Sequence, residues 1–166
     1  MTLSKEFLQQ SNYFLNLNLP RLEKCLNQLT EEEVWVKPNA ETNSIGNLIL
    51  HLCGNITQYI HHSLGHEKDK RERDLEFSTE GGFSKKELLE KIKEVTKKAI
   101  HIIENCSEEE LLRTRLVQGF SYTGIGIIIH VTEHYSYHIG QIAFWTKLMK
   151  EKDLGFYADH DLNIRN

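Results

Sequence analysis

Hydrophobic residues recur at helical spacing along four long segments of the chain, with apolar side chains three or four positions apart. These segments span about residues 4–29, 44–64, 84–105 and 124–150. Ser44 and Ser84 precede their segments as N-caps, and Gly65 can end the second segment. Pro20 lies inside the first segment, so we expect a kink or break there. The pattern predicts a bundle of four helices.

The connections between these segments are polar or irregular. Residues 66–83 form a charged connection, long enough to cross the bundle instead of making a tight hairpin. Within it, the signs of the charges alternate from Glu67 to Asp74, which favours a solvated loop. The segment from Arg115 to Tyr122 could be extended, but no partner for such a strand is evident.

A short internal repeat supports two similar helix pairs. The run Leu29–Val34 resembles Cys106–Leu111, and each run can cap a short helical turn. After an irregular stretch, each is followed by an apolar helix that carries histidine, around residues 44–52 and 123–131. Two such pairs packed together make a four-helix bundle.

Length and composition favour one domain spanning residues 1–166, a length sufficient for a core without disulfides. Hydrophobic residues make up 39% and charged residues 27%, as in globular proteins. The net charge of −4 and the lack of a basic stripe make nucleic acid an unexpected partner. No apolar run approaches the roughly 20 residues needed to cross a membrane. With no signal sequence at the start and three scattered cysteines, we expect a cytoplasmic protein.

Histidine is the unusual component, because nine histidines accompany only two methionines and two prolines. His130, His134 and His138 follow one another at intervals of four and lie on one face of the last predicted helix. Two imidazoles at this spacing can reach one metal ion at about 2.0–2.1 Å. Three ligands in a line along one helix do not converge easily. One of the three should therefore be spare, and another helix should supply a ligand.

His51 is the best candidate for that ligand. It lies in the apolar run Leu48–Leu52, where an unpaired imidazole would be costly. Three histidines with a further open position are typical of a catalytic zinc-type site. We therefore interpret His51, His134 and His138 as candidate metal ligands. The alternative is that His51 is a core histidine with satisfied nitrogens and that the four-residue spacing, which is common, has no metal-binding role.

The other candidate chemical groups carry weaker signals. His62 lies about 16 Å along a helix from His51, so the two cannot share an ion. It and His66 flank Gly65, where solvation at a helix end is the simpler interpretation. We expect His101 to pack beside its isoleucine neighbours.

Five residues near the histidines could serve the site, but each has a simpler interpretation. Glu133 points about 100° away from His134 around the helix, so we expect it to face solvent. Cys53 is expected to be a buried, inert thiol. Tyr59 and Tyr135 could line a pocket, as could Tyr137, although aromatic residues on bundle helices more often belong to the core.

The residues described above resemble those of the DinB/YfiT-like superfamily of metal-binding four-helix bundles. The resemblance rests on the run Asn47–Leu52, on the pattern His130-x-x-x-His134-x-x-x-His138-x-Gly140-Gln141-Ile142, and on Trp35, Pro38 and Asn43. It covers nearly the whole chain. Many members have arginine where this chain has Ile139, a departure that leaves the ligands intact but would alter a pocket or an interface.

The resemblance implies an all-α, four-helix bundle with up-down-down-up order and a long crossover between the second and third helices. It implies that His51, His134 and His138 bind a divalent metal ion, with zinc or nickel as frequent occupants, and that His130 is accessory. Homodimers are frequent in the superfamily, so we expect a homodimer here.

The leading functional hypothesis, by resemblance, is a metal-dependent enzyme that transfers a low-molecular-weight thiol to an electrophile. Its partner would then be a small-molecule substrate, not nucleic acid or a membrane. Two alternatives stay open: a metal-dependent hydrolase, and a non-catalytic, metal-stabilised binding protein. The sequence identifies neither the metal nor a general base.

Overall fold

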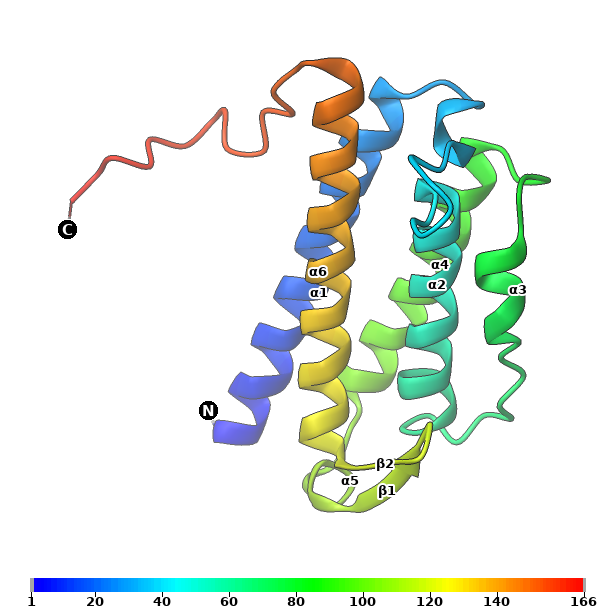
Figure 1. The fold of residues 1–166 in the computed structure, drawn as a ribbon. Helices are drawn as coiled ribbons and strands as arrows, with labels where there is room; N and C mark the ends of the chain where they lie inside the picture. Colours follow the sequence, from blue (N-terminus) through cyan, green and yellow to red (C-terminus); the bar gives the residue numbers. More distant parts are fainter. Residues whose placement is uncertain (1, 166) are drawn as a thin grey trace.

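The computed structural model of the protein describes residues 2–165 and consists mostly of helix. The four long helices are α1 (Leu3–Gln28), α2 (Ile45–Ile56), α4 (Lys85–Glu104) and α6 (Gly124–Lys150). In Figure 1, α1 and α6 run in one direction, whereas α2 and α4 run in the other. The predicted four-helix bundle with up-down-down-up order is therefore confirmed.

The helices begin where the sequence places hydroxyl caps. Ser44 and Ser84 each accept from the backbone N–H three residues later, and both positions form complete capping boxes. Thr123 caps α6 in the same way, accepting from the backbone of Gly126. Beyond its last residue, α2 continues into the π-helical turn η2 (Thr57–His62), so the two together make up the second predicted helix.

The core lies where the apolar faces of the four helices meet. Helix α1 packs against α4 and α6, and α2 also packs against α4 and α6. Among the fully buried side chains are Leu15, Leu22, Ile49, Leu52, Ile56, Leu88, Ile92, Ile127, Ile128 and Ile142. Of the kink or break predicted at Pro20, the break is wrong, because α1 continues through it with buried residues such as Leu15 and Leu22 on both sides. No helix within residues 2–165 combines the length and apolar character needed to cross a bilayer.

The crossover segment (residues 63–84) joins α2 to the parallel helix α4, as predicted. It contains the short helix α3 (Arg73–Ser78), which packs along α2 on the outside of the bundle (Figure 1). An earlier connection, between α1 and α2, carries the 3₁₀ turn η1 (Glu33–Trp35).

The closing connection (residues 105–123) joins α4 to α6 and holds a helical turn and a hairpin. The turn is α5 (Glu108–Leu112), capped by Ser107 as the internal repeat suggested. The antiparallel strands β1 (Thr114–Val117) and β2 (Phe120–Thr123) pair with each other. Gln118 and Gly119 between them both have positive φ, as a tight two-residue hairpin turn requires. The segment predicted to be extended without a partner thus folds back on itself.

Candidate metal centre

His51 is presented by the most buried helix of the bundle. All but one of the residues of α2 are buried, and His51 itself is only 7% exposed. The capping box of Ser44 and Asn47 fixes the start of the helix one turn before His51. An imidazole placed among apolar neighbours in this way must have its nitrogens satisfied or bear a large energetic penalty.

Helix α6 brings His134 and His138 to the same point, one helical turn apart. The ring centroid of His51 lies 5.1 Å from the ring centroid of His134 and 5.0 Å from that of His138. The Nε2 atoms of His51 and His134 are 2.9 Å apart. One ring nitrogen from each of the three histidines lies within 4.8 Å of the others. Two distant parts of the chain thus converge on one point, which is the geometry that the metal hypothesis needs.

The outer nitrogens of two of these rings are tied to oxygen acceptors. His51 Nδ1 lies 2.9 Å from Glu76 Oε2, and His138 Nδ1 lies 2.7 Å from Gln141 Oε1. Since a carboxylate and an amide oxygen accept, each Nδ1 carries the proton and each Nε2 keeps its lone pair. His138 Nε2 is buried and has no hydrogen-bond partner among residues 2–165. This buried free nitrogen, in a group of three imidazoles, fits a divalent cation such as zinc or nickel.

Burial keeps the imidazoles of His134 and His138 neutral. Burial, followed by the proximity of the other histidines, lowers the pKa of His134 to about 3. Burial likewise lowers the pKa of His138 to about 4, against the opposing effect of Gln141. Both rings are therefore neutral at neutral pH, the state in which an imidazole can bind a metal ion.

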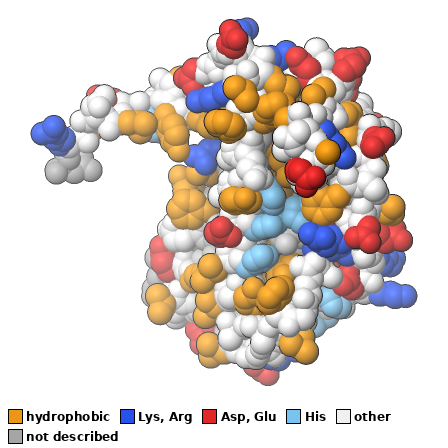
Figure 2. Space-filling view, in the orientation of Figure 1, with side chains coloured by type: hydrophobic (Ala, Val, Ile, Leu, Met, Phe, Trp, Pro, Cys, Tyr) orange, Lys and Arg blue, Asp and Glu red, His pale blue; other side chains and the backbone are white. Residues whose placement is uncertain are grey.

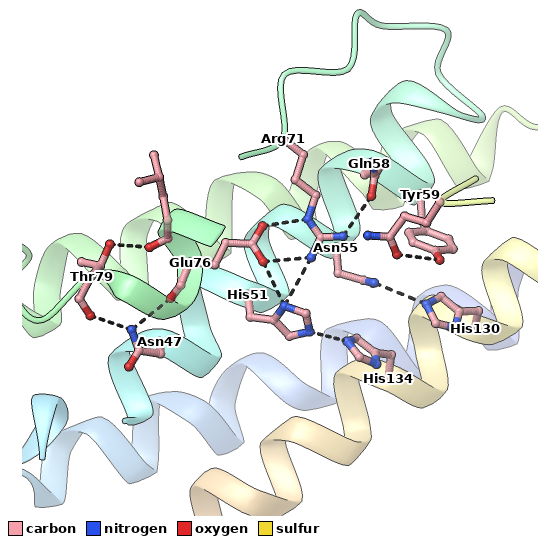
Figure 3. A network of polar contacts seen from close by, with 12 residues as sticks. Asn47, His51, Asn55, Gln58, Tyr59, Arg71, Glu76, Thr79, His130 and His134 are labelled. Atoms are coloured by element: carbon pink, nitrogen blue, oxygen red, sulfur yellow. Dashed lines mark hydrogen bonds and ion pairs between the residues drawn. The ribbon is translucent and has the colours of Figure 1, made fainter. Parts of the chain in front are cut away.

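The crossover segment covers the Nδ1 side of the His51 ring (Figure 3). Glu76 of α3 accepts from His51, while Arg71 donates to both carboxylate oxygens of Glu76. Burial opposes the ionisation of Glu76, but the hydrogen bonds from Arg71 and His51 outweigh it and the pKa lies below its ordinary value. The side chain of Arg71 is only 2% exposed. The prediction that residues 67–74 form a solvated loop was therefore wrong for Arg71.

His130 lies beside the three converging histidines but outside their group. Its ring stacks on that of His134, with the centroids 5.2 Å apart, and on that of Tyr59 at 4.3 Å. Its Nε2 lies 3.3 Å from Asn55 Nδ2. One histidine of the α6 row is thus spare, as the spacing suggested.

The remaining histidines lie elsewhere. His61 is buried against the carbonyl oxygen of Val95, and His62 contacts the carbonyl oxygen of Glu67. His66, His101 and His160 are exposed, so the expectation that His101 packs beside its isoleucine neighbours was wrong. Within residues 2–165, no second group of three His, Cys, Asp or Glu side chains is placed to hold a metal ion.

The residues near the histidines that could act as an acid, a base or a nucleophile are mostly core residues or face solvent. Glu133 is exposed, as expected. Tyr59 and Tyr135 are core residues, whereas Tyr137 is 56% exposed. Burial raises the pKa of the Cys53 thiol to about 12, so this cysteine is inert at neutral pH.

The histidines are reached from one face of the molecule. In Figure 2, histidine side chains come to the surface in the middle of this face, with hydrophobic side chains on either side. A cavity of about 590 Å³ adjoins His138. Apolar side chains form one part of its wall, and polar groups form the rest: Leu48, Phe144, Trp145 and Leu148, then Glu41, Thr42, Asn43, Tyr137 and Gln141. The arrangement offers space for a small molecule next to His138.

Comparison with known proteins gives a family and a fold. The model of a family described as a protein of unknown function, DUF1572, matches residues 2–158. No curated protein matches the sequence.

Two solved structures are similar over most of the chain. A DinB-like protein from Bacillus subtilis has a TM-score of 0.67 and 19% identity, and the match covers 89% of this chain and 96% of that one. A conserved protein from Enterococcus faecalis has a TM-score of 0.65 and 16% identity, with coverage of 92% and 99%. At these identities the likeness is one of fold.

Proposed function

We propose a function for this chain, which belongs to the DUF1572 family and has the DinB-like fold. The protein is a metal-dependent enzyme that transfers a low-molecular-weight thiol to an electrophile. The observation that carries the proposal is the convergence of His51, His134 and His138, with the buried Nε2 of His138 left without a partner. Both nitrogens of His51 have partners, as the alternative of a core histidine requires, but that alternative does not account for the free nitrogen of His138.

The three imidazoles would hold zinc or nickel, and the ion would lower the pKa of a thiol or water that binds to it. Hydrogen bonds within the protein would hold the imidazole rings in position for the ion. Glu76 and Gln141 each accept from an Nδ1–H and so direct the Nε2 atoms of His51 and His138 to a common point. The low pKa values of His134 and His138 keep the rings free of competing protons at neutral pH.

The cavity beside His138 supports a small, partly apolar electrophile as the second substrate. Its apolar wall would bind the body of such a molecule and exclude water from it. In the proposed reaction the thiol gives its proton to solvent, and the sulfur forms a bond to the electrophilic carbon. The leaving group departs with the electron pair of the broken bond.

The first test is metal analysis of protein purified without a histidine tag. We expect close to one zinc or nickel ion per chain, and loss of that ion in a His51→Ala/His138→Ala double variant. His101→Ala is the matched control, because this exposed histidine should have no influence on metal content. A double variant that retains stoichiometric metal would refute the assignment of the ligands.

The second test is thiol conjugation with a panel of electrophiles. We expect product formation that depends on added thiol and disappears in the double variant. Turnover of the same electrophiles by water without a thiol would support a hydrolase instead. A metal site without exchangeable water and without turnover would support a non-catalytic binding protein.

A further inference from the structure

The crossover segment supplies a buried ion pair to the back of His51. Arg71 Nε and Nη2 donate to Glu76 Oε1 and Oε2 at 2.7 and 2.9 Å, and Glu76 Oε2 accepts from His51 Nδ1 at 2.9 Å (Figure 3). The two charged side chains are only 2% and 9% exposed. Burying an ion pair carries a desolvation penalty that two apolar side chains would avoid. The pair therefore needs a role other than stabilising the fold.

One stripe of helix receives the crossover segment. Its members, spaced at i, i+4, i+7 and i+11 along α2 and η2, are Asn47, His51, Gly54 and Gln58. At one end, Asn47 Nδ2 donates to the carbonyl oxygens of Glu76 and Thr79 at 3.0 and 2.7 Å. At the other end, Gln58 Oε1 accepts from Arg71 Nη1 at 2.9 Å. The segment is thus fastened on both sides of His51.

Gly54 provides the space in which the Glu76 carboxylate lies. A Cβ atom at this position would be 1.8 Å from Glu76 Oε1 and 3.0 Å from Arg71 Nε. Any larger residue would displace the carboxylate. The protein could accommodate the larger residue, because the end of a glutamate side chain can rotate away. The movement would break the hydrogen bonds to His51 and Arg71, so the glycine and the ion pair form one arrangement.

We propose that Glu76, supported by Arg71, is a positioning residue for the metal centre, and that binding of the metal and docking of the crossover segment stabilise each other. The inference rests on the three-histidine centre of the proposed function but not on its reaction. A metal ion at Nε2 of His51 makes Nδ1–H a stronger donor to the carboxylate. By linkage, a docked carboxylate must then raise metal affinity as much as bound metal favours docking.

Zinc affinity, measured by competition with a chromophoric chelator, gives the first readout. Glu76→Gln keeps the shape of the side chain but removes the charge, and we expect zinc to bind about 10- to 100-fold more weakly. Glu72→Gln is the matched control, because Glu72 is an exposed carboxylate at the start of the same helix and makes no side-chain cap. Its zinc affinity should equal that of the wild type.

A second pair of variants protects the test against misfolding of Glu76→Gln. Gly54→Ala should weaken zinc binding and alter the visible absorption of the cobalt-substituted protein, because the ring of His51 loses its carboxylate. Gly140→Ala is the control, since a Cβ at this helical position meets no atom within 4 Å. An effect on helix stability alone would not change the cobalt spectrum.

Hydrogen exchange of residues 69–79, with and without zinc, tests the coupling. Zinc should slow exchange in the wild type and in Glu72→Gln, but not in Glu76→Gln. If the wild type binds zinc and Glu76→Gln binds it equally well, or if zinc leaves exchange in this segment unchanged, the inference is overturned while the proposed function stands. A wild type that binds neither zinc nor nickel overturns both.

Discussion

The two long connections of the bundle each bury an arginine, but they satisfy it differently. In the crossover segment, all three nitrogens of the Arg71 guanidinium group have partners, on Glu76 and Gln58. In the closing connection, Arg115 is 8% exposed and only its Nη2 is bonded, to the backbone and carboxylate of Glu110. Its Nε and Nη1 are buried without a partner among residues 2–165.

The partners of the two arginines also lead to different places. Glu76 continues to His51 and so joins the crossover segment to the candidate metal centre. Glu110 instead pairs with Arg113 and Arg115 of the same connection and with the exposed His66, none of which belongs to the centre. The ion pairs of the closing connection therefore do not reach the three histidines, whereas the crossover segment is part of the wall of the centre. The buried charge whose nitrogens are all satisfied is the one that adjoins the candidate centre, so satisfaction of a buried charge separates the two connections where burial alone does not.

Arg71→Met should give the largest loss of stability. The change leaves the Glu76 carboxylate buried without its cation, and breaking a buried pair in this way costs about 3–5 kcal/mol. Urea denaturation in the presence of a chelator measures the free energy of unfolding without a contribution from metal. Arg73→Met is the control, because Arg73 is exposed and its main contact is with the ring of Phe77; it should cost less than about 1 kcal/mol. Equal losses in the two variants would contradict the importance of the buried pair.

Zinc should stabilise the wild type and should not stabilise the His51→Ala/His138→Ala variant. A ligand that binds only the folded state at 100 times its Kd adds about 2.7 kcal/mol to the free energy of unfolding. Thermal unfolding with zinc and with chelator measures this difference, and His101→Ala should retain it. Full stabilisation of the double variant by zinc would place the metal elsewhere.

The sequence predicted the bundle well because its signals are local. Helical periodicity and the hydroxyl caps at Ser44 and Ser84 act within a few residues, and both predicted caps form. The prediction failed where packing overrides local preference. Pro20 was expected to kink or break α1, but the helix is unbroken, because buried residues before and after it hold it against the rest of the bundle.

The candidate centre was only half visible in the sequence. His134 and His138 share a helix face, and His51 is conspicuous in its apolar run, so the three rings could be named before any coordinates. Arg71 and Glu76 could not be named in this way. The residues that they contact on α2 and η2 are distant in the sequence, and the charges around Arg71 alternate in sign, as is typical of a solvated loop. Only the fold shows that α2 offers a stripe with a glycine opposite the carboxylate.

Gly119→Ala should destabilise the closing connection without affecting the centre. Gly119 has a φ of 81°, and a residue with a Cβ in the left-handed region costs about 1–2 kcal/mol. Gly81→Ala in the crossover segment is the control, because a Cβ there meets nothing within 4 Å. Chemical denaturation should show the loss in Gly119→Ala only, while zinc affinity should be unchanged in both. A fall in zinc affinity in Gly119→Ala would show that the hairpin also supports the histidines.

Arg115→Met should have the smallest effect and is the direct counterpart of Arg71→Met. Burial lowers the pKa of Arg115, which reflects the penalty for keeping this guanidinium group away from water. Replacing it with methionine loses the bonds to Glu110 but also removes two buried nitrogens that lack partners. These effects oppose each other, so we expect the free energy of unfolding to change by less than about 1 kcal/mol, with zinc affinity unchanged. A loss as large as that of Arg71→Met would mean that both connections depend on their buried charge, and the contrast between them would no longer mark the metal centre.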